Sequence, residues 1–151
     1  MKAFIGTFVN KIDAKGRVSV PAPFRAVVQA KGMNAVALYP SPTEACAEGC
    51  GMDRIDTLVD AMPDDFSPIA RNNDMAEIIL ASARETPFDA DGRVVLPEDF
   101  IAHAGLSERA AFVGKGRVFQ IWDPDKLAES HAALKQRIAA QRKAASGKGG
   151  A

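Results

Sequence analysis

The sequence predicts a mostly β fold with added helices, an α+β protein that uses one small unit twice. The main observation is an internal repeat, in which residues 13–26 align without gaps to residues 89–102 and eight of fourteen positions are identical. Chance would supply about one match in a window of that length, so duplication is the better explanation. In each copy a glycine-containing turn separates short runs rich in β-branched residues, a pattern typical of a hairpin.

The first copy is expected to open with a hairpin. Residues 4–9 form a β-rich stretch, the turn covers residues 13–16, and residues 17–20 form the returning strand. Pro21 ends that strand because proline has no N–H to donate to a sheet. A short helix, indicated by apolar residues at helical spacing, and a further strand over residues 36–39 complete the unit.

The second copy repeats this order. Its turn covers residues 89–92, its strand residues 93–96, and its short helix ends at Gly105. A final hairpin is predicted from residues 110–113 and 118–122, which flank a turn with two glycines. Two copies are too few for a solenoid, so we expect them to pack together and share a core.

Two longer helices are predicted outside the copies. Ser67 and Pro68 suit the start of a helix that continues to Ala83, whereas Asp123 and Pro124 suit the start of a terminal helix. The chain then divides into a first repeat (7–54), a helical linker (55–82), a second repeat (83–126), a carboxy-terminal helix (127–145) and a disordered tail (146–151).

The chain has no net charge, but its charge is unevenly distributed. Residues 1–31 have a balance of +5 and residues 126–151 also +5, whereas residues 41–66 have −6 and residues 85–106 have −4. A neutral protein with a basic amino-terminal segment can still bind a polyanion locally. The alternative is that these charges only keep the surface soluble.

The composition also sets expectations for location. The amino-terminal segment lacks the apolar core of a signal peptide, and no run approaches the roughly 18 apolar residues of a membrane span. Cys46 and Cys50 are too few for a disulfide framework. We therefore expect a cytoplasmic protein with no membrane partner.

The first turn contains the main candidates for DNA binding. A glycine-containing turn exposes its flanking side chains, so Lys15 could reach a nucleic acid as a point charge and Arg17 as a planar fork. Phosphate contacts give affinity, and an arginine on guanine gives sequence preference. Lys11 and Arg25 are further candidates, although such residues are more often ordinary solvated charges.

In the alternative interpretation, the same residues serve the turns. Asp13 would pair with Arg17 across its hairpin, and Asp89 with Arg93, so that each pair stabilises a turn. The second copy lacks the basic neighbours of the first, so we expect Arg93 to act mainly in its turn and at most as a secondary DNA contact. Both roles can hold in part.

Other residues give no catalytic or metal pattern. Cys46 and Cys50 have no histidine or further cysteine nearby in sequence to complete four zinc ligands, and His103 and His131 are isolated. The Gly114-Lys-Gly116 segment lacks the rest of a phosphate-loop motif and is interpreted as a hairpin turn. We therefore expect no enzyme activity, no metal, no cofactor and no small-molecule substrate.

These motifs resemble the MraZ family over nearly the whole chain. The resemblance lies in Asp13-Ala-Lys-Gly-Arg17 with Val20-Pro21 and Phe24-Arg25, and in Asp89-Ala-Asp-Gly-Arg93. It extends to Leu38-Tyr39-Pro40, Ala104-Gly-Leu106, Val113-Gly114 and Ile121-Trp122. Two departures, Asp91 in place of Lys15 and Ile101 in place of Arg25, weaken the case for DNA binding by the second copy.

The resemblance implies a fold, an assembly and a function. The fold would be two swapped-hairpin β-barrels of the SpoVT/AbrB type, forming a pseudo-dimer within one chain. The assembly would be a closed homo-oligomeric ring. The function would be sequence-specific regulation of transcription on short direct repeats of double-stranded DNA, upstream of division and cell-wall genes and of its own operon, in association with the nucleoid.

Two other functions remain open at this stage. In the first, the repeats only assemble an oligomeric scaffold or interaction protein, and the charges are solvated. In the second, the chain is an AbrB-type antitoxin whose carboxy-terminal segment neutralises a toxin, although such proteins are usually short and contain one copy of the fold. A measurement of DNA binding would distinguish the scaffold from a regulator. A test for a toxin partner would distinguish the antitoxin.

Overall fold

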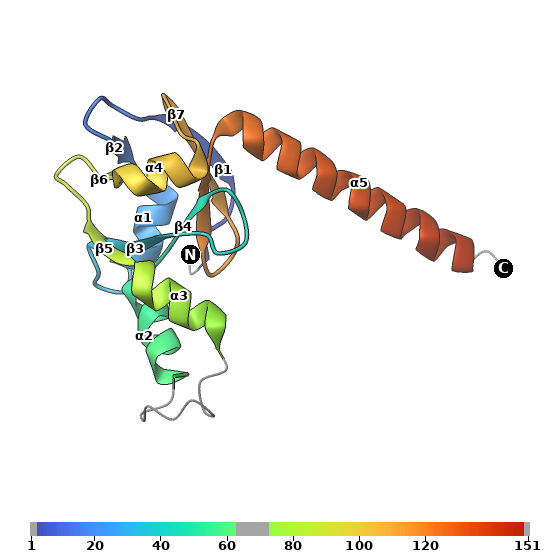
Figure 1. The fold of residues 1–151 in the computed structure, drawn as a ribbon, viewed down its shortest axis with the longest axis horizontal. Helices are drawn as coiled ribbons and strands as arrows, with labels where there is room; N and C mark the ends of the chain where they lie inside the picture. Colours follow the sequence, from blue (N-terminus) through green and yellow to red (C-terminus); the bar gives the residue numbers. More distant parts are fainter. Residues whose placement is uncertain (1–2, 63–72, 150–151) are drawn as a thin grey trace.

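The computed structural model describes residues 3–62 and 73–149 (Figure 1). In that part of the chain the elements follow in the order β1 (Thr7–Lys11), β2 (Arg17–Ser19), α1 (Ala22–Gln29), β3 (Ala35–Pro40), β4 (Ala47–Cys50), α2 (Met52–Asp60), α3 (Asp74–Ser82), β5 (Arg84–Pro87), β6 (Arg93–Val95), α4 (Glu98–Ala104), β7 (Arg109–Gly114), β8 (Phe119–Trp122) and α5 (Pro124–Gly149). This arrangement confirms the predicted α+β class.

The strands form two antiparallel sheets. The larger has the order β1-β7-β8-β4-β3-β5, and the smaller pairs β2 with β6. Under the sequence repeat β1 corresponds to β5, β7 to β3 and β8 to β4, so the order of the large sheet is the same from either edge. A pseudo-two-fold axis therefore passes between β4 and β8.

The two copies exchange strands. Strand β1 of the first copy pairs with β7 of the second, with Thr7 opposite Val113 and Lys11 opposite Arg109. Strand β5 of the second copy pairs in the same way with β3 of the first. Each copy therefore completes the sheet of the other, as expected for an intrachain pseudo-dimer of swapped units.

The predicted closed barrels are not found. Among the described residues the large sheet stays open, with β1 and β5 as its edges, and β2 and β6 pair only with each other apart from a single bridge between Ile12 and Val18. The reason is the length of β2 and β6. Each is three residues long and is followed within two residues by a proline, Pro21 or Pro97, which cannot continue a ladder.

The core lies between the sheet and the two short helices. Phe24 of α1 and Phe100 of α4 occupy the same position in the two copies, and both are buried in one cluster. The ring of Phe24 packs against those of Phe4 and Phe119, at centroid distances of 5.4 and 5.5 Å. Because both copies contribute to this cluster, neither has a core of its own, which agrees with the expectation that small units must pack together.

The linker helices differ from the prediction. Strand β4 is followed directly by α2, and α3 begins at Asp74 because the side chain of Asn73 accepts the N–H of Ala76 as an N-cap. The predicted start at Ser67 and Pro68 lies outside the described residues. Helix α3 ends at Ser82, close to the predicted end of the linker.

Helix α5 begins as predicted and continues further. The carboxylate of Asp123 accepts the N–H of Lys126 at 3.1 Å, which is an N-cap contact. The helix then extends away from the rest of the protein to Gly149, beyond the predicted end at residue 145, because its second half is rich in alanine, lysine, arginine and glutamine, all strong helix formers (Figure 1). Residues 150–151 of the predicted tail lie outside the described range. None of the described helices has the length and apolarity needed to span a membrane.

Candidate nucleic-acid interface

The first repeated turn is closed by Asp13. One oxygen of its carboxylate accepts the backbone N–H groups of Lys15 and Arg17, both at 2.9 Å, and the other accepts Nε of Arg17 at 2.6 Å. Gly16 has a φ of +79°, which favours glycine, and a Cβ there would lie 3.0 Å from the carbonyl oxygen of Leu96. The backbone N–H of Arg17 is the main reason that the pKa of Asp13 lies below its usual value.

The second turn repeats this geometry with one difference. The carboxylate of Asp89 accepts the N–H groups of Asp91 and Arg93, and it accepts Nε of Arg93 at 2.9 Å. In addition, Nη2 of Arg93 lies 3.3 Å from the carboxylate of Asp91. Arg93 therefore has two carboxylate partners, whereas Arg17 has one.

The tips of the two turns differ in charge. Lys15 is exposed at the first tip, and the corresponding residue of the second tip is the exposed Asp91. Both Asp-x-x-x-Arg pairs thus form the turn contacts considered in the sequence interpretation. Lys15 therefore places a cation at the first tip, where the second tip has the carboxylate of Asp91.

Strand exchange places Arg25 at the second turn. Its Nη1 donates to the carbonyl oxygen of Val20 at 2.8 Å, and its guanidinium covers Gly92 so closely that a Cβ at this glycine would overlap it. Arg25 borders the same hollow as Asp89 and Asp91. Arg25 therefore borders the second turn, although it is close to Arg17 in sequence.

The first turn receives the corresponding helix of the other copy. Glu98 and Ile101 of α4 border the hollow that also contains Asp13 and Lys15. Ile101, which replaces Arg25 in the repeat, lies 3.7 Å from the position of a Cβ on Gly16. The exchange therefore gives the first turn an acidic neighbour, Glu98, and gives the second turn a basic one.

Comparison with known proteins identifies the family. A family model described as "MraZ protein, putative antitoxin-like" matches residues 79–146. A Transcriptional regulator MraZ of Rhodospirillum rubrum is 48% identical over 143 residues, which cover 93% of this chain and 92% of that protein. The chain belongs to the MraZ family. The corresponding regulators of Parvibaculum lavamentivorans and Rickettsia akari are 43% and 41% identical and cover 91% and 95% of the chain, and 86% and 95% of their own lengths.

In this MraZ-family chain, Lys11 has a basic partner that the sequence interpretation missed. Lys11 lies at the end of β1, directly opposite Arg109 on β7, and both side chains are exposed. Like charges directly opposite each other destabilise a sheet, so this pair favours a role in binding an anion. Because Arg109 is nearly a hundred residues away in sequence, only the exchanged pairing of β1 with β7 reveals it.

The cysteines and histidines of the MraZ-family chain form no site in the described part. Cys46 and Cys50 are free and buried, and burial raises the pKa of each thiol to about 12. Nε2 of His103 lies 3.1 Å from the carbonyl oxygen of Glu44. No group of three or more potential metal ligands occurs among the described residues.

Proposed function

We propose that this MraZ-family chain is a sequence-specific DNA-binding regulator of transcription that reads DNA with its first turn. The observation that carries the proposal is the difference between the two turns. Lys15 is exposed at the first tip and Arg17 has a single carboxylate partner, whereas Arg93 is held between two. The relatives from Rhodospirillum and Rickettsia, named transcriptional regulators, support the same role.

The basic side chains divide into two roles. Lys15, Lys11 and Arg109 are exposed and suit phosphate contacts, which provide affinity without sequence preference. Arg17 suits a base edge, because Asp13 holds its Nε and leaves the two terminal nitrogens to form a bidentate contact with guanine. Arg25 adds a cation beside the second turn, where it offsets the acidic groups and suits one further phosphate.

One subunit offers few contacts, so the proposal includes an oligomer. About four or five phosphate contacts give weak, salt-sensitive binding, and several linked subunits convert them into useful affinity. Exposed apolar side chains on α2 and α3, namely Val59, Met75 and Ile78, support assembly because a monomer would leave them in water. A closed ring acting on direct repeats in its own upstream DNA, in the cytoplasm at the nucleoid, would combine these properties.

The proposal is tested by a mobility-shift titration with DNA from upstream of the chain's own gene. A scrambled duplex of equal length is the control, and both are measured at two salt concentrations. We expect a shift specific to the upstream DNA that weakens steeply as salt rises, because phosphate contacts release counterions. A discrete oligomer that binds neither duplex would instead support the scaffold function, and salt-independent binding would contradict the proposed contacts.

A further inference from the structure

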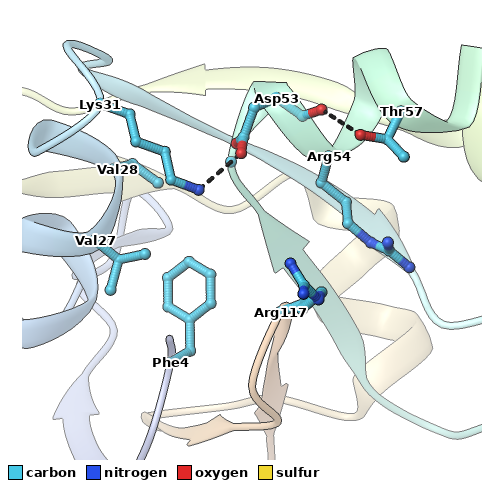
Figure 2. A pocket seen from close by; sticks show the side chains of 9 residues that line it. Phe4, Val27, Val28, Lys31, Asp53, Arg54, Thr57 and Arg117 are labelled. Carbon is cyan, nitrogen blue, oxygen red and sulfur yellow. Dashed lines mark hydrogen bonds and ion pairs between the residues drawn. The ribbon is translucent and has the colours of Figure 1, made fainter. Parts of the chain in front are cut away.

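A cavity of about 210 Å³ has no residue of either turn in its lining (Figure 2). It forms where the last turn of α1 meets the start of α2, the amino-terminal segment and the β7–β8 turn. Its volume is below the range of about 300–1,000 Å³ that suits drug-sized ligands, so any ligand would be small. None of the residues that contact DNA in the proposal above borders it.

One side of this cavity is apolar and the other is cationic. Phe4, Val27 and Val28 form the apolar side, and all three are buried members of the main core. Figure 2 shows Arg54 of α2 and Arg117 of the β7–β8 turn on the opposite side. A site for a small organic molecule usually combines an apolar wall with a few polar groups.

Lys31 and Asp53 neutralise each other at the rim. Nζ of Lys31 lies 2.7 Å from the carboxylate of Asp53, and this contact is the main cause of the lowered pKa of Asp53. Among the described residues that border the cavity, Asp53 is the only one with a carboxylate. The Lys31–Asp53 pair has no net charge. The other two charged residues of the lining, Arg54 and Arg117, therefore give the cavity a net charge of +2.

Neither of these arginines has an ion-pair partner within residues 3–62 and 73–149. By contrast, Arg17, Arg84 and Arg93 each lie within 4.0 Å of a carboxylate. Two guanidinium groups that share one cavity repel each other, and an anion between them removes this repulsion. A guanidinium fork matches the oxygen atoms of phosphate or carboxylate in a bidentate manner.

The cavity is not a simple consequence of the duplication, because the corresponding place in the second copy is built differently. The segment from the start of α4 to the start of β7 is two residues shorter than that from α1 to β3. Lys126, which corresponds to Arg54 under the pairing of β4 with β8, lies over Gly105 so closely that a Cβ there would overlap its ammonium. A cation at the end of a helix is favourable, so Lys126 has a local role that Arg54 lacks.

We propose that this cavity binds a phosphate monoester with a compact apolar group. The dianionic phosphate would bridge Arg54 and Arg117, and the apolar group would lie against Phe4, Val27 and Val28. The charge of +2 matches a dianion, and the apolar wall favours an ester over free phosphate. The cavity includes no residue of the turns that we propose to bind DNA, so ligand binding in the cavity can be tested separately from DNA binding.

The test uses phenyl phosphate as the probe and the backbone amide NMR signals of Gly51, Arg54 and Thr57 as the readout. We expect phenyl phosphate to cause saturable shifts of these signals. Inorganic phosphate, which lacks the apolar group, should bind at least fivefold more weakly. Benzoate, which lacks the second negative charge, should also bind at least fivefold more weakly. Arg117→Gln and Arg54→Gln should each weaken the binding of phenyl phosphate at least tenfold, and the double variant should not bind it. Arg117→Lys should lose less affinity than Arg117→Gln, because lysine keeps the positive charge but lacks the planar guanidinium group.

A matched control is Arg137→Gln on the exposed part of α5, which removes the same charge and should leave binding unchanged. Thermal unfolding without ligand, equal to that of the unchanged chain, establishes that the variants are folded. Shifts that do not saturate, or that persist in the folded double variant, would overturn the proposal. It would also be overturned if the double variant lost DNA binding while the unchanged chain ignored phenyl phosphate, since the arginines would then be DNA contacts.

Discussion

Val18 and Val94 lie directly opposite each other in the β2–β6 ribbon and hold the same position in the two copies. The pseudo-two-fold axis therefore passes between them. Their flanking pairs are related by the same symmetry, since Arg17 faces Val95 and Ser19 faces Arg93. Each valine is about 1% exposed, so the two side chains share one buried environment.

We expect Val18→Ala and Val94→Ala to destabilise the protein equally. Each change removes two buried methyl groups and leaves a void, at a cost of roughly 1.5–3 kcal/mol. Val95→Ala is the matched control, because the Val95 side chain is 55% exposed and its loss should change stability by at most about 0.5 kcal/mol. Urea unfolding of the three variants measures the differences. A clear inequality between Val18→Ala and Val94→Ala would contradict the shared environment.

The sequence predicted the local elements of each copy well, because turns and short helices depend on neighbouring residues. The Asp-x-x-Gly turns, the strand ends at Pro21 and Pro97, and the helix end at Gly105 all follow from local chemistry. Strand β4 was not predicted, since Ala47–Cys50 has neither alternation nor β-branched residues. It is stabilised by its partners β3 and β8 on either side.

The neighbours of the candidate site were less predictable, because they depend on which copy pairs with which. Sequence proximity groups Arg25 with Arg17, but the exchanged arrangement places Arg25 over Gly92 and brings Glu98 to the first turn. The pairing of Lys11 with Arg109 likewise depends on a long-range register. Local motifs specify the turns themselves, whereas the exchange determines the charge around them.

Both turns should weaken in acid. The pKa values of Asp13 and Asp89 lie below the usual 3.8, mainly because backbone N–H groups of Arg17 and Arg93 donate to the carboxylates. A lowered pKa in the folded state means that the stabilisation is present above the unfolded-state pKa and is lost as pH falls through the folded value. The protection of the Arg17 and Arg93 amides against exchange, relative to the intrinsic rate at each pH, should therefore fall below about pH 4.

Asp13→Asn is the control for the first turn, because it keeps an acceptor oxygen but does not ionise. Protection of the Arg17 amide should be lower than in the unchanged chain near neutral pH and should no longer fall in acid, while protection of the Arg93 amide should still fall in acid. An acid dependence at Arg17 that persists in Asp13→Asn would show that another group controls the turn.

Cys46 and Cys50 should resist thiol reagents in the folded protein. Burial raises the pKa of each thiol to about 12, so the reactive thiolate is scarce near neutral pH, and both side chains are inaccessible. We expect an aromatic disulfide reagent to label neither thiol in native conditions and to label two per chain in denaturant. Rapid labelling of the native protein at pH 8 would contradict the buried positions.

Assembly should depend on the exposed apolar side chains of α3. Ile78 is 51% exposed, and Ile78→Glu would place a charge in any interface that covers it. We expect a lower mass by light scattering during size exclusion, with unchanged secondary structure by circular dichroism. Val95→Glu, at a similarly exposed apolar position on β6, should keep the mass of the unchanged chain. If only Val95→Glu lowered the mass of the assembly, the interface would lie on the β2–β6 ribbon and not on α3.

The two arginines of the repeated turns should differ in their effect on DNA binding. Arg17 gives up a single carboxylate contact to reach a base, and Lys15 beside it attracts phosphate, whereas Arg93 is held by Asp89 and Asp91. Arg17→Ala should weaken operator binding by roughly 1–3 kcal/mol for each engaged site, accumulated over the linked subunits, and should leave the oligomer intact. Arg93→Ala should lower stability or assembly instead, because it removes the partner of two carboxylates.

Asp91→Lys provides a gain-of-function variant for the same comparison. It gives the second tip the charge of Lys15 and removes one partner of Arg93, so nonspecific DNA binding should tighten and its salt dependence should become steeper. Titrations with operator DNA, run beside size-exclusion profiles, measure all three variants. If Arg17→Ala binds like the unchanged chain while a folded and assembled Arg93→Ala does not bind, the second turn reads the DNA. The two carboxylates around Arg93 would then orient it toward a base rather than withhold it.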